Sequence, residues 1–151
     1  MIRTICILNG PAPNTGDCGS CQIILPGSQC GRTNDIYVTV LDSSHQVSPK
    51  GRFIGIVSTT VETGTPPKEL VPGLDLLGGK AGNILENFTT ISPYLVPNPD
   101  TGADGIYVTE SYDATSHFET ACLDVTSVFA KVTGEALDLD NMKITSPEDE
   151  E

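Results

Sequence analysis

DIYVTVLDSSHQVSPKGRFIGIVSTTV, residues 35–61, is the stretch that decides the fold. Apolar residues alternate with others over Asp35–Leu41, which predicts a strand with one buried face. A second strand is predicted over Arg52–Val61, and its apolar run Phe53-Ile-Gly-Ile-Val57 suggests burial on both faces. The polar residues between the two strands form a loop. We therefore expect a long hairpin and a strand-rich domain.

The same signals predict further elements on both sides of the hairpin. Strand patterns occur at Thr4–Leu8, Gln22–Leu25, Phe88–Val96 (interrupted by Pro93) and Gly105–Asp113. A short helix is predicted over Lys68–Leu77, after the Pro66-Pro67 break. Pro72 is tolerated if it falls early in this helix, whereas it would kink a helix that begins at Pro67. The predicted fold class is therefore mixed α/β.

One long helix is predicted near the C-terminus, over residues 117–133. Apolar side chains recur there at spacings of three and four, which is typical of one continuous helix face. The members of this apolar stripe are Phe118, Ala121, Cys122, Val125, Val128, Phe129 and Val132. Gly134 follows and predicts a left-handed end to the helix.

The decapeptide Ser111–Thr120 lies where the last predicted strand leads into this helix. His117 could act as a base or a metal ligand there, with Asp113 as its acid partner. Asp113 precedes the helix, however, so that geometry is not assured. A structural interpretation explains the same residues: Ser116 and Glu119 have the spacing of a capping box, with Asp113 or Thr115 as alternative caps. We interpret His117 as a polar residue of the first turn and expect no catalytic residue.

The cysteines suggest a second kind of site. Cys18 and Cys21 form a CxxC pair, Cys30 follows, and His45 is the nearest candidate for a fourth zinc ligand. A redox CxxC would instead stand at a helix N-terminus, whereas this one precedes a predicted strand. Cys21 fits a small residue within that strand. We expect reduced thiols and no bound metal.

Other polar candidates also have structural explanations. A possible binding lip consists of Thr59, Thr60, Glu62 and Thr63, although threonines of a strand are typically half-buried with satisfied hydroxyls. Gly78–Gly82 follows a predicted helix instead of a strand, which argues against a phosphate-binding loop. Asn87-Phe-Thr89 matches the glycosylation triplet, but a cytosolic chain would not meet the enzyme.

Charge and length narrow the classes of partner. The 151 residues carry a net charge of −12, which disfavours nucleic acid and anionic membrane surfaces. No apolar run approaches the length of about 18 residues that a membrane-spanning helix needs, so no stable membrane insertion is expected.

Ordered blocks of the sequence resemble the Rab GDP-dissociation inhibitors. Ile56–Thr63 and Ser111–Thr120 are the most specific of these blocks. The weaker ones, in the family's order, are Ile5–Leu8, Ser20–Pro26, Asp35–Val38 and Asp140–Lys143. The related Rab escort proteins match the two specific blocks less well. The family's opening strand and Gly-rich turn have no counterpart in this chain.

The resemblance implies a place in the fold. Residues 1–143 would be the C-terminal third of a family protein, an incomplete portion of its large, FAD-oxidase-like domain, with strands followed by one long helix. Residues 144–151 would form an acidic disordered tail.

The resemblance also implies a function. The intact cytosolic protein would bind GDP-bound, prenylated Rab GTPases, slow GDP release and recycle Rabs between membrane and cytosol, without cofactor or covalent chemistry. This segment would be mainly a scaffold, because the family's Rab-contacting platform lies upstream. Two alternatives stay open: a small metal-binding interaction module built on Cys18, Cys21 and Cys30, or a fragment of a flavin-dependent oxidoreductase.

Overall fold

The structure is a computed structural model that describes residues 1–98, 102–111, 113–115 and 118–141. These residues belong to two units, one formed by residues 1–94 and 112–118 and the other by residues 95–111 and 119–151. The first unit contains a sheet and two short helices, and the second contains one long helix.

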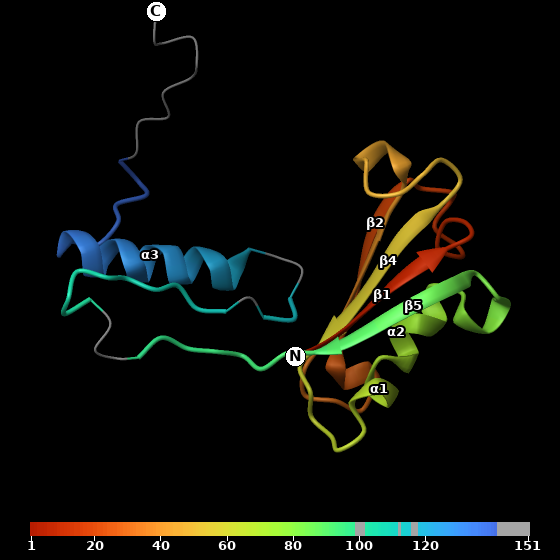
Figure 1. Cartoon of the computed structure of the whole chain (residues 1–151), viewed down its shortest axis with the longest axis horizontal. Coiled ribbons are helices and arrows are strands. Elements are labelled where there is room, and N and C mark those ends of the chain that lie inside the picture. Colours follow the sequence, from red (N-terminus) through yellow and green to blue (C-terminus); the bar gives the residue numbers. More distant parts are fainter. Residues whose placement is uncertain (99–101, 112, 116–117, 142–151) are drawn as a thin grey trace, which may run out of the picture. The chain divides into compact units, whose positions relative to one another are not determined.

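A five-stranded sheet dominates the first unit (Figure 1). Its strands are β1 (Ile2–Leu8), β2 (Ser20–Leu25), β3 (Ile36–Leu41), β4 (Phe53–Thr59) and β5 (Ile84–Ile91). The spatial order is β2-β3-β4-β1-β5, and every neighbouring pair is antiparallel. The expected hairpin is confirmed, because β3 pairs with β4 in the register Ile36 to Thr59.

One face of this sheet carries the core. The pleat places alternate residues on the same side, and this side holds the fully buried Ile2, Cys6, Leu8, Ile36, Val38, Val40 and Val57. Burial on both faces of β4 was expected but is wrong, because Ile54 and Ile56 are only half-buried while Gly55 and Val57 are buried.

Two short helices cover the buried face. They are α1 (Pro66–Glu69) and α2 (Val71–Leu76), flanked by the fully buried Leu70 and Leu77. α2 approaches the sheet closely at Gly73, where an added Cβ would lie 2.5 Å from the Val57 side chain. The helix expected over Lys68–Leu77 is therefore divided in two. Pro72 stands at the start of α2, where a missing amide disrupts no helical hydrogen bond.

Two strand predictions need correction. The fifth strand runs over Ile84–Ile91 instead of Phe88–Val96, because pairing with β1 selects it and it ends before Pro93. Gly105–Ser111 is not a strand. Its alternation was a true pattern, but no described strand pairs with this segment to form a ladder.

The long C-terminal helix is α3, Glu119–Thr133. It ends as expected at Gly134, which has a φ of +78° and whose amide donates to the Ala130 carbonyl at 2.9 Å. Its start falls two residues later than expected. Ser116 and His117 lie outside the described residues, as does the expected acidic tail. Among the described residues, no helix combines the length and apolar character that a bilayer crossing requires.

Candidate functional site

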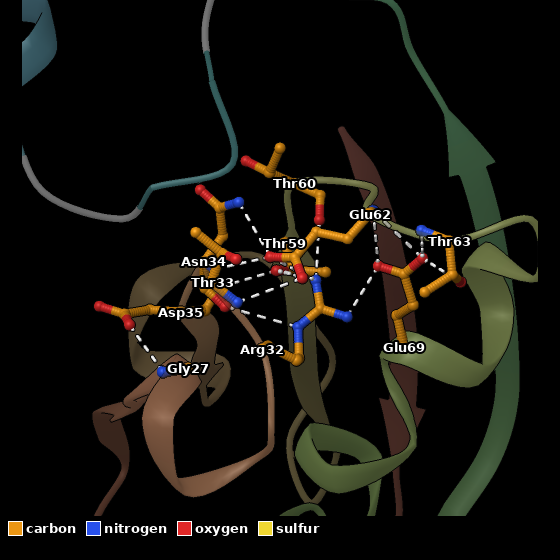
Figure 2. Close-up of polar contacts among 10 residues, drawn as sticks. All are labelled: Gly27, Arg32, Thr33, Asn34, Asp35, Thr59, Thr60, Glu62, Thr63 and Glu69. Carbon is orange, nitrogen blue, oxygen red and sulfur yellow. Dashed lines mark hydrogen bonds and ion pairs between the residues drawn. The ribbon is translucent and has the colours of Figure 1, made fainter.

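A polar network connects the loop before β3, the end of β4 and α1 (Figure 2). We call it the arginine cluster; it comprises Arg32, Asn34, Asp35, Thr59, Glu62, Thr63 and Glu69. It contains the largest set of side-chain hydrogen bonds among the described residues, so it is the first place to look for a site.

Arg32 lies at the centre of the arginine cluster. Its Nη1 donates to Oε2 of Glu69 at 2.7 Å, and its Nη2 donates to the Thr60 carbonyl at 2.9 Å and to Oγ1 of Thr59 at 3.2 Å. The Arg32 side chain is only 9% exposed. A buried guanidinium needs such a dense set of acceptors, because removing a charge from water is costly unless it is paired.

Glu69 is the anionic partner, and its side chain is 3% exposed. Burial alone would raise the pKa of this carboxyl group. Four sets of hydrogen bonds oppose burial: one from the Thr63 hydroxyl at 2.6 Å, one from Arg32, and those from the backbone amides of Glu62 and Thr63. Together they lower the pKa of Glu69 to about 2. Glu69 is therefore ionised at neutral pH, so it cannot serve as a general acid there and is at most a weak general base.

Glu62 fixes the loop from the other side. Its carboxylate accepts from the amide of Asn34 at 2.6 Å, from the Asn34 side chain at 2.9 Å and from the amide of Thr33 at 3.2 Å. Hydrogen bonds from Asn34, chiefly the one from its amide, lower the pKa of Glu62. Arg32 Nη2 lies 3.5 Å from the same carboxylate.

Thr59 and Asp35 complete the network. The Thr59 hydroxyl donates to the Asp35 carbonyl at 2.7 Å, and the Asp35 side chain accepts from the Gly27 amide at 2.8 Å. Thr59 is fully buried, and its bond to the Asp35 carbonyl confirms that its hydroxyl is satisfied, as expected for a strand threonine. Thr60 and Thr63, by contrast, lie beyond the end of β4, so the strand interpretation is wrong for them.

The arginine cluster acts as a structural clamp, by which we mean that its ion pair and hydrogen bonds hold separate segments together. The pKa values of the Glu62 and Glu69 carboxyl groups are lowered, and the guanidinium and the Thr59 and Thr63 hydroxyls are engaged in hydrogen bonds. The clamp ties residues that are 37 positions apart in sequence, Arg32 and Glu69. We conclude that it holds the loop before β3, the end of β4 and α1 in one arrangement.

Part of the decapeptide Ser111–Thr120 is described, and that part is structural. The Asp113 carboxylate accepts from the Thr115 amide at 2.8 Å, which forms a tight turn instead of a cap on α3. Ala114 is buried, and its carbonyl accepts from the Ser58 hydroxyl at 2.7 Å. His117 and Ser116 lie outside the described residues, so the expected capping box stays a prediction, and the Asp113–His117 pair, which we did not expect, is not tested.

The cysteine candidates do not converge on a metal. Cys18, Cys21, Cys30 and His45 are all described, and no group of three potential ligands within reach of one ion occurs in the described part of the chain. Cys21 lies on β2, and burial and the neighbouring Cys18 raise the pKa of its thiol. His45 instead lies 3.2 Å from the Asp42 carboxylate.

The glycine candidate also lies where a phosphate loop is not expected. Gly78–Gly82 surrounds a single turn, Gly79–Ala81, that follows α2 and not a strand. Asn87 lies on the exposed strand β5.

Sequence reasoning did not single out Arg32 or Glu69. Arg32 belongs to a turn-rich loop and Glu69 to a four-residue helix, so neither has a periodic pattern around it. The one available signal was scarcity: the chain has only eight lysines and arginines against twenty acidic residues, so each cation is a candidate for a structural ion pair.

Comparison with known proteins identifies chains that are similar to this one. The family model for GDP dissociation inhibitor matches residues 1–144. Rab GDP dissociation inhibitor beta from Canis lupus familiaris is 46% identical over 144 residues, which cover 95% of this chain and 31% of the relative. The protein of the same name from Rattus norvegicus gives the same identity and coverage.

A solved structure agrees with the sequence comparison. The crystal structure of Rab GDI from Plasmodium falciparum superposes with a TM-score of 0.81 at 45% identity, covering 91% of this chain and 30% of that one. The expected mixed α/β fold is thus confirmed as a fragment of that structure. The chain spans about a third of the length of the relatives that it matches.

Proposed function

The chain belongs to the GDP dissociation inhibitor family, and from this premise we propose that the longer protein to which it corresponds binds GDP-bound Rab GTPases. Such a protein slows the release of GDP, holds prenylated Rabs in the cytosol and recycles them between membranes. The observation that carries the proposal is the 46% identity over 144 residues to proteins named Rab GDP dissociation inhibitor beta.

Within that protein, we assign this chain a scaffold role as the C-terminal third, where it supplies an incomplete portion of the large domain. The clamp supports this role, because the charged groups of Arg32 and Glu69 pair with each other and bond to neighbouring loops. Residues 1–143 would then be one portion of that domain, and residues 144–151 an acidic tail.

The function proposed for the longer protein is binding without covalent chemistry. Internal hydrogen bonds lower the pKa values of Glu62 and Glu69 in the arginine cluster, which suits a structural role better than proton transfer. The metal-module alternative is not favoured, because the cysteines do not form a ligand group among the described residues. The flavin-enzyme alternative is not favoured either, since the relatives named above are inhibitors.

The test uses a graft protein, defined as the dog Rab GDP dissociation inhibitor beta in which this chain replaces the matching segment. Release of a fluorescent GDP analogue from a prenylated Rab is measured with and without the graft protein, with the unaltered dog protein as control. We expect the graft protein to slow release to a similar extent, with the nucleotide recovered unchanged. A correctly folded graft protein that leaves the release rate unaltered would contradict the proposal.

A further inference from the structure

The strand register defines a second, apolar face of the sheet. Residues directly opposite in antiparallel strands point to the same side. Ile5 of β1 pairs with Ile56 of β4 and with Phe88 of β5, and Ile7 pairs with Ile54. These side chains lie opposite the core that α1 and α2 cover. We call this side the open face; its members include the apolar Ile5, Ile7, Ile54, Ile56 and Phe88 and the polar Arg3, Ser58, Glu86 and Thr90.

The open face is incompletely covered. Ile5 is 42% exposed and Phe88 is 60% exposed, whereas the next residues along β1, Thr4 and Cys6, are buried on the other side. A contiguous apolar surface of this kind on a sheet is typical of an interaction site. By itself the surface does not say what binds it.

Arg3 supplies the chemistry of the missing partner. It stands on the open face between Ser58 of β4 and Thr90 of β5. In the part of the chain that the structure describes, its buried Nε has no hydrogen-bond partner, and its Nη2 reaches only the weak acceptor Sδ of Met1 at 4.0 Å. No ion pair of Arg3 with a carboxylate occurs in the described residues. A buried guanidinium N–H without an acceptor is unfavourable, so an anionic group is the expected partner.

One corner of the open face already accepts polypeptide. Ser58 is buried there, and its hydroxyl donates to the carbonyl of Ala114 from the turn Asp113–Thr115. A chain segment therefore packs on this side of the sheet next to Arg3 in the register. The uncovered remainder, around Ile5 and Phe88, continues the same surface.

We propose that the open face docks the part of the longer protein that lies outside these 151 residues, and that this part presents a carboxylate to Arg3. The proposal rests on the proposed function, which makes this chain one segment of a longer inhibitor. The matched segment is only 31% of the dog relative, so about two thirds of that protein is available as the occupant. The occupant covers Ile5, Ile56 and Phe88 with apolar side chains.

Thiol labelling with resolution of individual peptides tests the docking. Ile5→Cys reports on the open face, and Val47→Cys is the matched control, because Val47 is 49% exposed and lies in the loop before β4. In the 151-residue chain both variants should react at comparable rates. In the graft protein, Ile5→Cys should react at least tenfold more slowly, while Val47→Cys is unchanged.

The possible outcomes separate the occupants. Equal labelling of the two variants in the graft protein would overturn the proposal. Protection of Ile5→Cys in the isolated chain that increases with concentration would show a second copy on the open face and would also overturn it. If the graft protein does not fold, the same comparison at the aligned positions of the dog relative gives the same decision without a graft.

Arg3→Gln tests the charge complement, with Arg52→Gln as control because Arg52 bonds to Asn9 and its own loop. Arg3→Gln should lower the melting temperature of the graft protein by about 3–6 °C and leave the isolated chain nearly unchanged. Equal effects of the two substitutions in the graft protein would refute the proposal that the docked part presents a carboxylate to Arg3. A graft protein that slows GDP release but leaves Ile5→Cys reactive contradicts only this inference, whereas the reverse result contradicts only the proposed function.

Discussion

Glu69 connects α1 to the loop around Arg32, and its ionisation should therefore control stability. Its pKa in the folded chain is about 2, below the ordinary value of 4.5. A lowered carboxyl pKa stabilises the fold above pH 4.5, and this contribution is lost as the pH falls from about 4.5 to about 2. The full contribution at neutral pH is at most about 3 kcal/mol.

The corresponding variant is Glu69→Gln, which leaves Arg32 buried beside a neutral group. We expect the free energy of unfolding at pH 7 to fall by about 2–4 kcal/mol. The difference from the wild type should narrow at pH 3, where the wild-type carboxylate has already lost more than half of its contribution to stability. Urea denaturation at both pH values measures this, with the exposed Glu86→Gln as control. If the difference in unfolding free energy between the wild type and Glu69→Gln stayed constant between pH 7 and pH 3, the lowered pKa of Glu69 would be excluded.

Gly73 is required by the close approach of α2 to the sheet. An added Cβ would lie 2.5 Å from the Val57 side chain, and 3.1 and 3.2 Å from the side chains of Ile36 and Val38. We expect Gly73→Ala to destabilise the chain by about 1–3 kcal/mol through overpacking, even though alanine favours a helix by about 1 kcal/mol. Gly64→Ala, which meets nothing within 4 Å, should change the urea midpoint little. A neutral or stabilising Gly73→Ala would mean that α2 can shift away from β4.

The end of α3 gives a prediction for a single element. Gly134 has a φ of +78°, a conformation that costs an L-residue about 1–2 kcal/mol. Gly134→Ala should therefore fray the last turn, and amides near Ala130 should exchange faster with solvent. Ser127→Ala, within the exposed side of α3, should instead slow exchange slightly, because alanine has the higher helix propensity. Unchanged exchange in Gly134→Ala would show that the last turn does not depend on this glycine.

Elements with strong local periodicity could be predicted from the sequence, and paired elements only in part. The hairpin of β3 and β4 carries alternation and a polar loop, and α3 has spacing of three and four residues followed by Gly134. The predicted bounds of β5 lay too far along the chain, because its first half contains Glu86 and Asn87, which lack strand propensity. Only pairing with β1 makes these residues a strand. Gly105–Ser111 shows the converse, since alternation without a partner does not form a ladder.

The arginine cluster was even less accessible to sequence reasoning. Thr59, Glu62 and Thr63 were noticed as polar residues near the end of a strand. Their anchors, Arg32 and Glu69, become neighbours only when the β3–β4 hairpin folds and α1 returns over its end. No spacing rule connects positions that a sheet and a loop bring together, so this kind of clamp is found by structure.

Within the first unit, α1 and α2 cover one face of the sheet, and the chain spans about a third of its relatives' length. Under the proposed function, the longer protein would hold both the GTPase and its prenyl groups, whereas the described residues offer one internally paired clamp and one open face. We therefore expect that the 151-residue chain alone does not release prenylated Rab from liposomes.

The measurement is flotation of liposomes loaded with GDP-bound prenylated Rab, with the released fraction determined after addition of the chain. The dog Rab GDP dissociation inhibitor beta serves as the positive control, and the graft protein shows whether the missing portion restores release. The expected result is release by the dog protein and the graft protein and none by the chain, because a scaffold without the remaining two thirds lacks the surfaces that bind Rab. Release by the chain alone would locate a Rab-binding surface within these residues, and the open face would then be its first candidate.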